Sequence, residues 1–395
     1  MTQDRRSFMK SAAFAGLAPV AGALAPAPGH AKSAEAGVPP LRPYLPTGFA
    51  DFKHRCVADV FPRDHRYMWP ETTFRDLPME AGWIWGSLYD EEGNVHIVLR
   101  PVQTYVATVL AIFHNRGADA CKIAMESMMG WRGPISIDKL DKGYRWKSAD
   151  YGFLGTSSFT ITLEDDRFAW FEKDLVDIQG KLVPMAMQYY DPMPKPMHGQ
   201  AYVAQLIRAQ GTVLGKKVEG WIGWDFEFLA PGQVYRTSPM SMRENDEGVA
   251  LTWCEFANEY VDGSWEIGWC AVGLENWGFA AGFDSTGAAW SGQVLGAEFE
   301  FQPATDVGRF PKRYRVRVYN TTRGREEVYE WNAAPRTNLV DIPRVFPELA
   351  TYLSCEGRMQ RVGDMRKVKR SVGYPDFYSD AKRHAAYQAQ WGAAR

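Results

Sequence analysis

One run of nine residues, from 220 to 228, holds the side chains most suited to chemistry: it reads GWIGWDFEF. On a β-strand, Trp221, Asp225 and Glu227 share one face, because successive side chains alternate. The two carboxylates then lie about 7 Å apart, and Gly223 leaves room above the backbone. If this face lines a barrel cavity, apolar surroundings hold one carboxyl protonated as a proton donor while the other stays ionised. The alternative is an ordinary solvent-facing side of a sheet.

A second group of candidates combines acids with tryptophans between residues 253 and 277. Glu255 is the candidate acid, and Trp253 and Trp277 are candidate substrate-binding residues. Acids near Trp also serve as acceptors for buried indole N–H groups, which is the structural alternative. His65 follows Asp64 and titrates near neutral pH, so it is either a further catalytic candidate or half of a surface pair.

A Pro-rich loop at 189–199 presents Tyr190 and His198, and is interpreted either as a lid over a pocket or as a rigid connector. No phosphate-binding loop, dinucleotide fingerprint or nucleophile elbow is present in the sequence. The five Cys and the His residues are scattered, without metal-ligand spacing. We therefore expect neither a metal site nor a cofactor.

The elements that must position these residues are short strands separated by Gly, Asp and Pro turns. The strand candidates are a hairpin at 83–99 and the segments 105–113, 158–163, 167–175, 182–190, 218–229, 249–260, 265–274, 279–283, 295–301, 313–319 and 326–331. Residues 116–130 fit a short helix or a strand equally well. Two successive series with almost no helix predict a mainly β chain of two tandem antiparallel barrel or sandwich units.

The predicted organisation follows from these segments. A Pro-rich, irregular leader at 32–75 precedes an N-terminal β unit at 76–232 and a C-terminal β unit at 233–375. A short helix spans 376–395, with Ser379 as its N-cap.

Two details of the second unit depend on register. Cys254 and Cys270 lie on strands joined around 261–263, and a three-residue loop with Gly263 in the left-handed conformation places them directly opposite. A two-residue loop places them on different faces, so a disulfide depends on the loop. Basic residues around Val368 predict an edge strand guarded by charge.

The N-terminus carries Arg5-Arg6, then Phe8 and Lys10, then an uncharged stretch to Ala31. It resembles the bacterial twin-arginine (Tat) export signal, which implies that residues 1–31 are removed, that the mature protein is periplasmic, and that the Tat translocase is a transient partner. The stretch is only weakly apolar, so we expect no stable membrane anchor. A net charge of -2 gives no overall field for nucleic acid.

Three runs resemble a known family: the hairpin at 83–99, Trp224-Asp225, and the late segments Cys355-Glu356-Gly357-Arg358 and Val372-Gly373-Tyr374. Over residues 80–375 the chain is similar to the lipocalin-like carotenoid hydratases of the hydroxyneurosporene-synthase type. The resemblance implies two lipocalin-like units side by side and an acid, Asp225, that protonates an alkene in an apolar cavity before water adds. The chain departs from the family in lacking its His/Trp runs.

These observations predict a periplasmic, cofactor-independent acid/base enzyme: a hydratase, a lyase (hydro-lyase) or an isomerase. Its substrate is expected to be an apolar or aromatic small molecule such as a terpenoid, steroid or phenolic. Two alternatives stay open: a carbohydrate-active lyase or hydrolase whose Trp faces stack on sugar rings, and a non-catalytic periplasmic binding protein.

Overall fold

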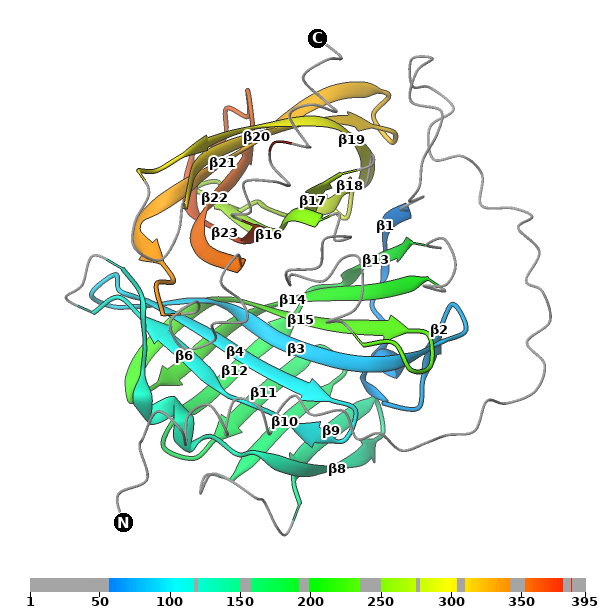
Figure 1. Ribbon diagram of the computed structural model, residues 1–395, viewed down its shortest axis with the longest axis vertical. Coiled ribbons are helices and arrows are strands. Elements are labelled where there is room, and N and C mark those ends of the chain that lie inside the picture. Colours follow the sequence, from blue (N-terminus) through cyan, green and yellow to red (C-terminus); the bar gives the residue numbers. More distant parts are fainter. Residues whose placement is uncertain are drawn as a thin grey trace.

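Two antiparallel β units lie against each other in the computed structural model (Figure 1). The structure describes residues 57–116, 120–149, 158–191, 199–234, 250–274, 278–303, 310–341, 352–378 and 385. The prediction of a mainly β chain built from two antiparallel units is confirmed.

The N-terminal unit is a fifteen-stranded sheet that closes on itself. Strand β3 pairs with both β15 and β4, which completes the ring β3-β15-β14-β12-β11-β10-β9-β8-β5-β4. Its strands are β1 (Val57–Pro62), β2 (Thr73–Phe74), β3 (Leu77–Asp90), β4 (Val95–Gln103), β5 (Val106–Ala107), β6 (Ala111–His114), β7 (Lys122–Ile123), β8 (Gly133–Leu140), β9 (Gly143–Ser148), β10 (Phe159–Glu164), β11 (Arg167–Glu172), β12 (Val176–Leu182), β13 (Met185–Asp191), β14 (Gln200–Val213) and β15 (Lys216–Leu229).

The C-terminal unit is a closed barrel in which each strand pairs with the next and the last pairs with the first. Its strands are β16 (Ala250–Tyr260), β17 (Trp265–Gly273), β18 (Gly278–Asp284), β19 (Ala289–Phe301), β20 (Pro311–Asn320), β21 (Arg325–Asn338), β22 (Tyr352–Arg361) and β23 (Val368–Tyr378). Even-numbered side chains of β16, such as Cys254 and Phe256, fill the barrel together with Trp290, Tyr314 and Trp331.

Strand β15 separates two apolar layers, as its period of two requires. Ile222, Trp224 and Phe226 enter the core of the N-terminal unit. Trp221 lies on the opposite face, in a cluster that includes Trp253 from the C-terminal barrel. Figure 1 shows β3, β14 and β15 lying beside that barrel. The face that carries Trp221, Asp225 and Glu227 therefore turns toward the second unit, and the expectation that it lines a barrel cavity is wrong.

The β16–β17 loop has the predicted three-residue form. Gly263 has a φ of +85° and its N–H donates to the carbonyl of Tyr260. Cys254 and Cys270 consequently lie directly opposite each other, but no disulfide joins them. Strand β23 pairs with β22 and β16, so the basic stretch around Val368 is not an edge strand.

Three predicted boundaries differ from the structure. The leader is not wholly irregular, because residues 57–62 form β1, which pairs with β13. Residues 116–130 contain a 3-10 helix (Met125–Met129) after the short strand β7, and a second 3-10 helix spans His65–Met68. Strand β23 runs to Tyr378, past the predicted boundary at 375. Beyond it only Ala385 is described, and it is helical.

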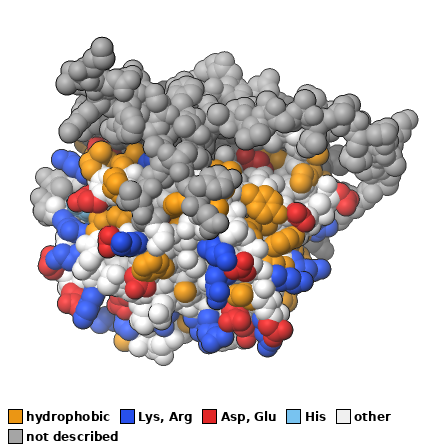
Figure 2. Space-filling view, turned by 90° about the horizontal axis from the view of Figure 1, so that it is seen from below, with side chains coloured by type: hydrophobic (Ala, Val, Ile, Leu, Met, Phe, Trp, Pro, Cys, Tyr) orange, Lys and Arg blue, Asp and Glu red, His pale blue; other side chains and the backbone are white. Residues whose placement is uncertain are grey.

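Charges are mixed on the face of the molecule shown in Figure 2, where basic and acidic side chains alternate over the described residues. Within the described ranges, no helix combines the length and the apolar character that crossing a bilayer requires.

Candidate active site at the interface of the two units

Two carboxyl groups from different units meet between the units. Asp225 on β15 is 1% exposed and Glu255 on β16 is 3% exposed. Asp225 Oδ2 accepts hydrogen bonds from Trp85 Nε1 at 2.6 Å and from the Tyr202 hydroxyl at 2.9 Å. Asp225 Oδ1 and both Glu255 oxygens are buried and receive no N–H or O–H donor from the described residues. A proton shared between the two carboxyls satisfies two of these three oxygens.

Burial raises the pKa of both acids. The pKa of Asp225 rises to about 7, even though hydrogen bonds from Glu255, Trp85 and Tyr202 oppose the rise. Burial raises the pKa of Glu255 well above its usual value, and the charge of Asp225 raises it further. Two adjacent buried carboxyls cannot both ionise at low cost, so the pair retains a proton near neutral pH.

The hydrogen bonds decide which acid holds that proton. Asp225 receives two donors that stabilise a carboxylate. The one indole that lowers the pKa of Glu255, that of Trp269, makes no hydrogen bond of standard geometry to it. Asp225 is therefore the acceptor in the pair, and Glu255 carries the proton. This order differs from the family resemblance, which implies Asp225 as the proton donor.

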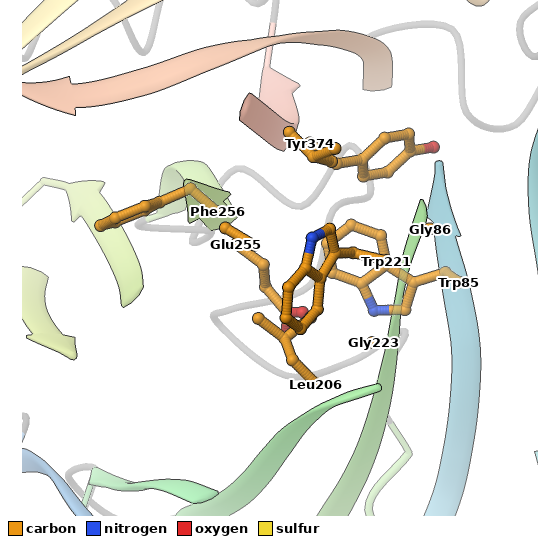
Figure 3. Close-up of a pocket in the computed structure, with 10 residues that line it drawn as sticks. Trp85, Gly86, Leu206, Trp221, Gly223, Glu255, Phe256 and Tyr374 are labelled. Carbon is orange, nitrogen blue, oxygen red and sulfur yellow. The ribbon is translucent and has the colours of Figure 1, made fainter. Parts of the chain in front are cut away.

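A small pocket lies on the open side of Glu255. Figure 3 shows Glu255 reaching from β16 toward Trp221 and Gly223. Its lining is Trp85, Gly86, Leu206, Trp221, Gly223, Glu255, Phe256, Ala257, Val372 and Tyr374. The space inside it is about 10 Å³, which is room for about one water molecule. Pockets that enclose a drug-sized ligand hold roughly 300–1,000 Å³, so a substrate reaches Glu255 only when the pocket opens. Asp225 lies behind Glu255 and does not line it.

Gly223 makes the approach of Glu255 possible. A Cβ atom at this position would lie 2.5 Å from Glu255 Oε2 and 3.4 Å from Trp85 Nε1. The prediction that Gly223 leaves room above the strand is confirmed, and the group that occupies the room is the carboxyl of Glu255.

Glu227 belongs to a different acid pair. Gln200 Nε2 donates to Glu227 Oε1 at 2.5 Å. Burial raises the pKa of Glu227 well above its usual value, and the charge of Glu80 adds to the effect. Burial also raises the pKa of Glu80 to about 7. Neither acid lines the pocket, so we place this pair outside the reacting site.

The remaining predicted residues divide into three groups. Trp253 packs in the interface, 4.9 Å from Tyr202 between ring centroids, on the same face as Glu255 but outside the pocket lining. Tyr190 packs against the core of the N-terminal unit. His65 interacts with charged residues of the N-terminal unit, and its pKa is lowered mainly by burial. Neither lies at the carboxyl pair. Trp277 and His198 fall outside the described residues.

Sequence reasoning missed the residues that other strands bring to the pair: Trp85 and Tyr202, which donate to Asp225, and Tyr374. The ring centroid of Tyr374 lies 4.6 Å from that of Trp85, over the pocket. The register pairs Trp85 with Gly223, and Tyr374 with Glu255. The alternation of side chains along each strand indicates which residues share a face. Which of these residues come together depends on how the strands pair, and that is seen only in the structure.

In the part of the chain that the structure describes, no group of three or more His, Cys, Asp or Glu side chains could hold a metal ion. What the described site can supply is a proton from Glu255, a negative charge beside it on Asp225, and an aromatic wall.

No protein-family model matches this chain, and no curated protein matches it. The chain is similar to the crystal structure of a candidate AttH protein from Nitrosomonas europaea, with a TM-score of 0.44 and 14% identity over 79% of this chain and 96% of that chain. It is also similar to kievitone hydratase from Nectria haematococca, with a TM-score of 0.37 and 9% identity over 80% of this chain and 93% of that chain. Both TM-scores are low, so neither likeness bears on activity.

Proposed function

We propose that this protein is an acid/base enzyme that adds water to, or removes water from, an apolar or aromatic small molecule, with Glu255 as the proton donor. One observation carries the proposal: the buried carboxyl of Glu255, whose pKa is raised by burial, faces an aromatic pocket while Asp225 lies behind it as its partner. A carboxyl kept neutral by apolar surroundings is a general acid at neutral pH.

The two carboxyl groups and one water molecule account for every proton in the reaction. Glu255 gives its proton to one carbon of a double bond, and the electron pair of that bond forms the new C–H bond. The cation that remains lies beside two carboxylates, Glu255 and Asp225, whose charge stabilises it. Water then adds to the cation, and the proton that the water loses returns to the pair. In the reverse direction, Glu255 protonates a hydroxyl and water leaves with the electron pair of the C–O bond. The carbon next to the cation then gives a proton to the pair, and the electrons of that C–H bond form the double bond.

The pocket favours the apolar substrate class over the sugar class. Beside Glu255 its wall consists of aromatic and aliphatic side chains such as Trp221, Leu206 and Val372. Such a wall offers few partners for the hydroxyls of a sugar. Alkenes of the terpenoid or carotenoid type, steroids and phenolics all present an apolar end that fits this description.

The same proposal includes the place of action. The pair Arg5-Arg6 and the weakly apolar stretch that follows support export through the twin-arginine pathway and a periplasmic mature protein.

The test is incorporation of solvent deuterium. The full protein is incubated in D₂O with a panel of terpenoid alkenes, terpenoid alcohols, steroids and phenolics, and with a panel of oligosaccharides, and products are analysed by mass spectrometry. A hydratase or isomerase places deuterium on carbon, since Glu255 exchanges its proton with solvent. We expect Glu255→Gln to lower the rate at least 100-fold, within the range of general acid catalysis.

Glu80→Gln is the matched control, because Glu80 is a second interface acid with a raised pKa that does not line the pocket. It should retain turnover. Equal turnover by Glu255→Gln and the parent protein would remove Glu255 from the mechanism. Turnover of oligosaccharides alone would favour the carbohydrate alternative, and ligand-induced changes in Trp fluorescence without any turnover would favour a binding protein.

A further inference from the structure

Two ion pairs join the two units beside the pocket. Arg208 Nε on β14 lies 3.2 Å from Glu259 Oε1 on β16. Glu219 on β15 pairs with Arg370 on β23. In both pairs one partner belongs to the N-terminal unit and the other to the C-terminal barrel.

The four residues form one alternating ring of charge. Glu259 and Arg370 lie directly opposite each other in the β16–β23 register. The charge of Arg208, together with that of Arg370, lowers the pKa of Glu219, so Arg208 faces both acids. We call these four residues, Arg208, Glu219, Glu259 and Arg370, the ionic rim.

Each member of the ionic rim lies two positions along its strand from a residue that lines the pocket. The pocket-lining residues are Leu206, Trp221, Ala257 and Val372, on β14, β15, β16 and β23 respectively. Residues two apart on a strand share a face. The ionic rim therefore stands directly beyond the pocket wall on all four strands.

Exposure falls steeply from the ionic rim inward. The side chains of Arg208 and Glu219 are 61% and 57% exposed. The next layer, which contains Trp221, is 4% exposed or less, and Glu255 beyond it is 3% exposed. On the other side of the carboxyl pair the interface is filled by Tyr202 and Trp253 in ring contact. Through the described residues, the short route from solvent to Glu255 passes the ionic rim.

We infer that the ionic rim is the entrance of the pocket and that its two ion pairs must part to admit a substrate to Glu255. The pocket as it stands has a volume of about 10 Å³, room for about one water molecule, so an opening motion between the units is required before any substrate enters. Each ion pair joins an exposed side chain to a more buried one, since Glu259 is 10% and Arg370 26% exposed. The exposed partner of each pair lies in water, where salt screens its charge and weakens the pair. That a substrate enters here rests on the proposed function. The positions of the ion pairs and of the pocket are the same whichever reaction takes place.

The test measures access to the pocket without any substrate. Ala257 lines the pocket and is 2% exposed, so Ala257→Cys places a reporter thiol behind the ionic rim. Its reaction with N-ethylmaleimide is followed by peptide-resolved mass spectrometry of the full protein. The native Cys121 and Cys270 serve as internal references, because burial raises the pKa of each thiol to about 12 and makes both slow to react.

In this background, Arg208→Met with Arg370→Met removes both ion pairs and keeps most of the apolar stems. We expect labelling at position 257 to become about three- to tenfold faster, the size of effect that two partly exposed ion pairs support. High salt should accelerate labelling of the parent and leave the double variant unchanged, since only the parent has ion pairs to screen. The double variant Arg313→Met with Glu300→Gln, which removes an exposed pair elsewhere on the barrel, should leave the rate at 257 unchanged.

Exchanging charges within the ionic rim distinguishes opening at the ion pairs from a general loosening of the fold. Glu219→Lys places cations together and should speed labelling. Inverting the other three members as well, with Arg208→Glu, Glu259→Lys and Arg370→Glu, restores the alternation and should restore the slow rate. An unchanged rate at 257 in the double Met variant would overturn the inference, as would equal acceleration at Cys270, which would show unfolding instead of opening. Because no substrate is used, these outcomes stand apart from the outcome of the Glu255→Gln experiment.

Discussion

At the scale of single residues, the molecule buries several acids whose environments differ. Glu255 has a carboxyl neighbour and an open pocket in front of it, Glu227 has Gln200 as a donor, and Glu356 on β22 is fully buried. Burial raises the pKa of all three. A raised pKa therefore does not single out the reacting group. The pocket in front of Glu255 does, because a proton donor must touch its substrate.

Glu356 does not line the pocket, so its substitution measures how the burial of an acid changes the free energy of unfolding without changing the site. Burial raises its pKa to about 8. Between the ordinary pKa of Glu and pH 8 the folded state holds a proton that the unfolded state releases, so the free energy of unfolding falls as pH rises through this window. Glu356→Gln removes this contribution. We expect similar melting temperatures for variant and parent at pH 5 and a melting temperature several degrees higher for the variant at pH 9.

Thermal unfolding followed by circular dichroism at both pH values measures this difference. The acids at the site keep part of the pH dependence in both proteins, since the pKa of Asp225 is also raised, to about 7. Curves of melting temperature against pH that run parallel for the two proteins would contradict the raised pKa of Glu356.

At the scale of elements, the site depends on how closely β16 approaches β15. Gly223 has no side chain, and Glu255 Oε2 fills the space where a Cβ would stand, 2.5 Å away. Gly223→Ala should push the carboxyl of Glu255 away from Asp225 and Trp85. We expect turnover to fall at least tenfold, with a loss of stability of ~1–3 kcal/mol, as for other insertions into packed regions.

Kinetics with the substrate found by deuterium incorporation, together with denaturant unfolding, test this prediction. Ala257→Gly, which trims the pocket wall without displacing Glu255, is the comparison variant and should retain more turnover. Full turnover by Gly223→Ala would show that the contact between Glu255 and β15 is not needed.

The same elements show what sequence alone could predict. Alternation within β15 is local, so the assignment of Trp224 and Phe226 to the core and of Asp225 to the opposite face was correct. The loop at Gly263 was also predictable, because a left-handed glycine specifies the hairpin. The strands at 133–148 and 200–213 were missed, and with them Tyr202, the donor to Asp225. Sequence patterns showed these acids and aromatics singly but not which strands would bring them together.

At the scale of the whole molecule, the carboxyl pair exists only because two units pack face to face. Asp225 belongs to one unit and Glu255 to the other, and the ionic rim also takes one partner of each pair from each unit. Pairing across an interface leaves no periodic mark in a sequence, which is why Asp225 and Glu227 looked like partners on one strand. The same packing means that the site is complete only when both units are folded.

Export through the twin-arginine pathway is part of the proposed function, and it rests on the N-terminal Arg5-Arg6 pair. Arg5→Lys with Arg6→Lys keeps the charge but removes the pair that the signal requires. In a bacterial host with an active Tat system, we expect this variant to accumulate in the cytoplasm as a precursor longer by about 31 residues, while the parent appears in the periplasm in its shorter form. Lys10→Arg is the control and should be exported. Cell fractionation with immunoblotting distinguishes these outcomes, and periplasmic delivery of the doubly substituted variant at the parent's level would rule out the twin-arginine route.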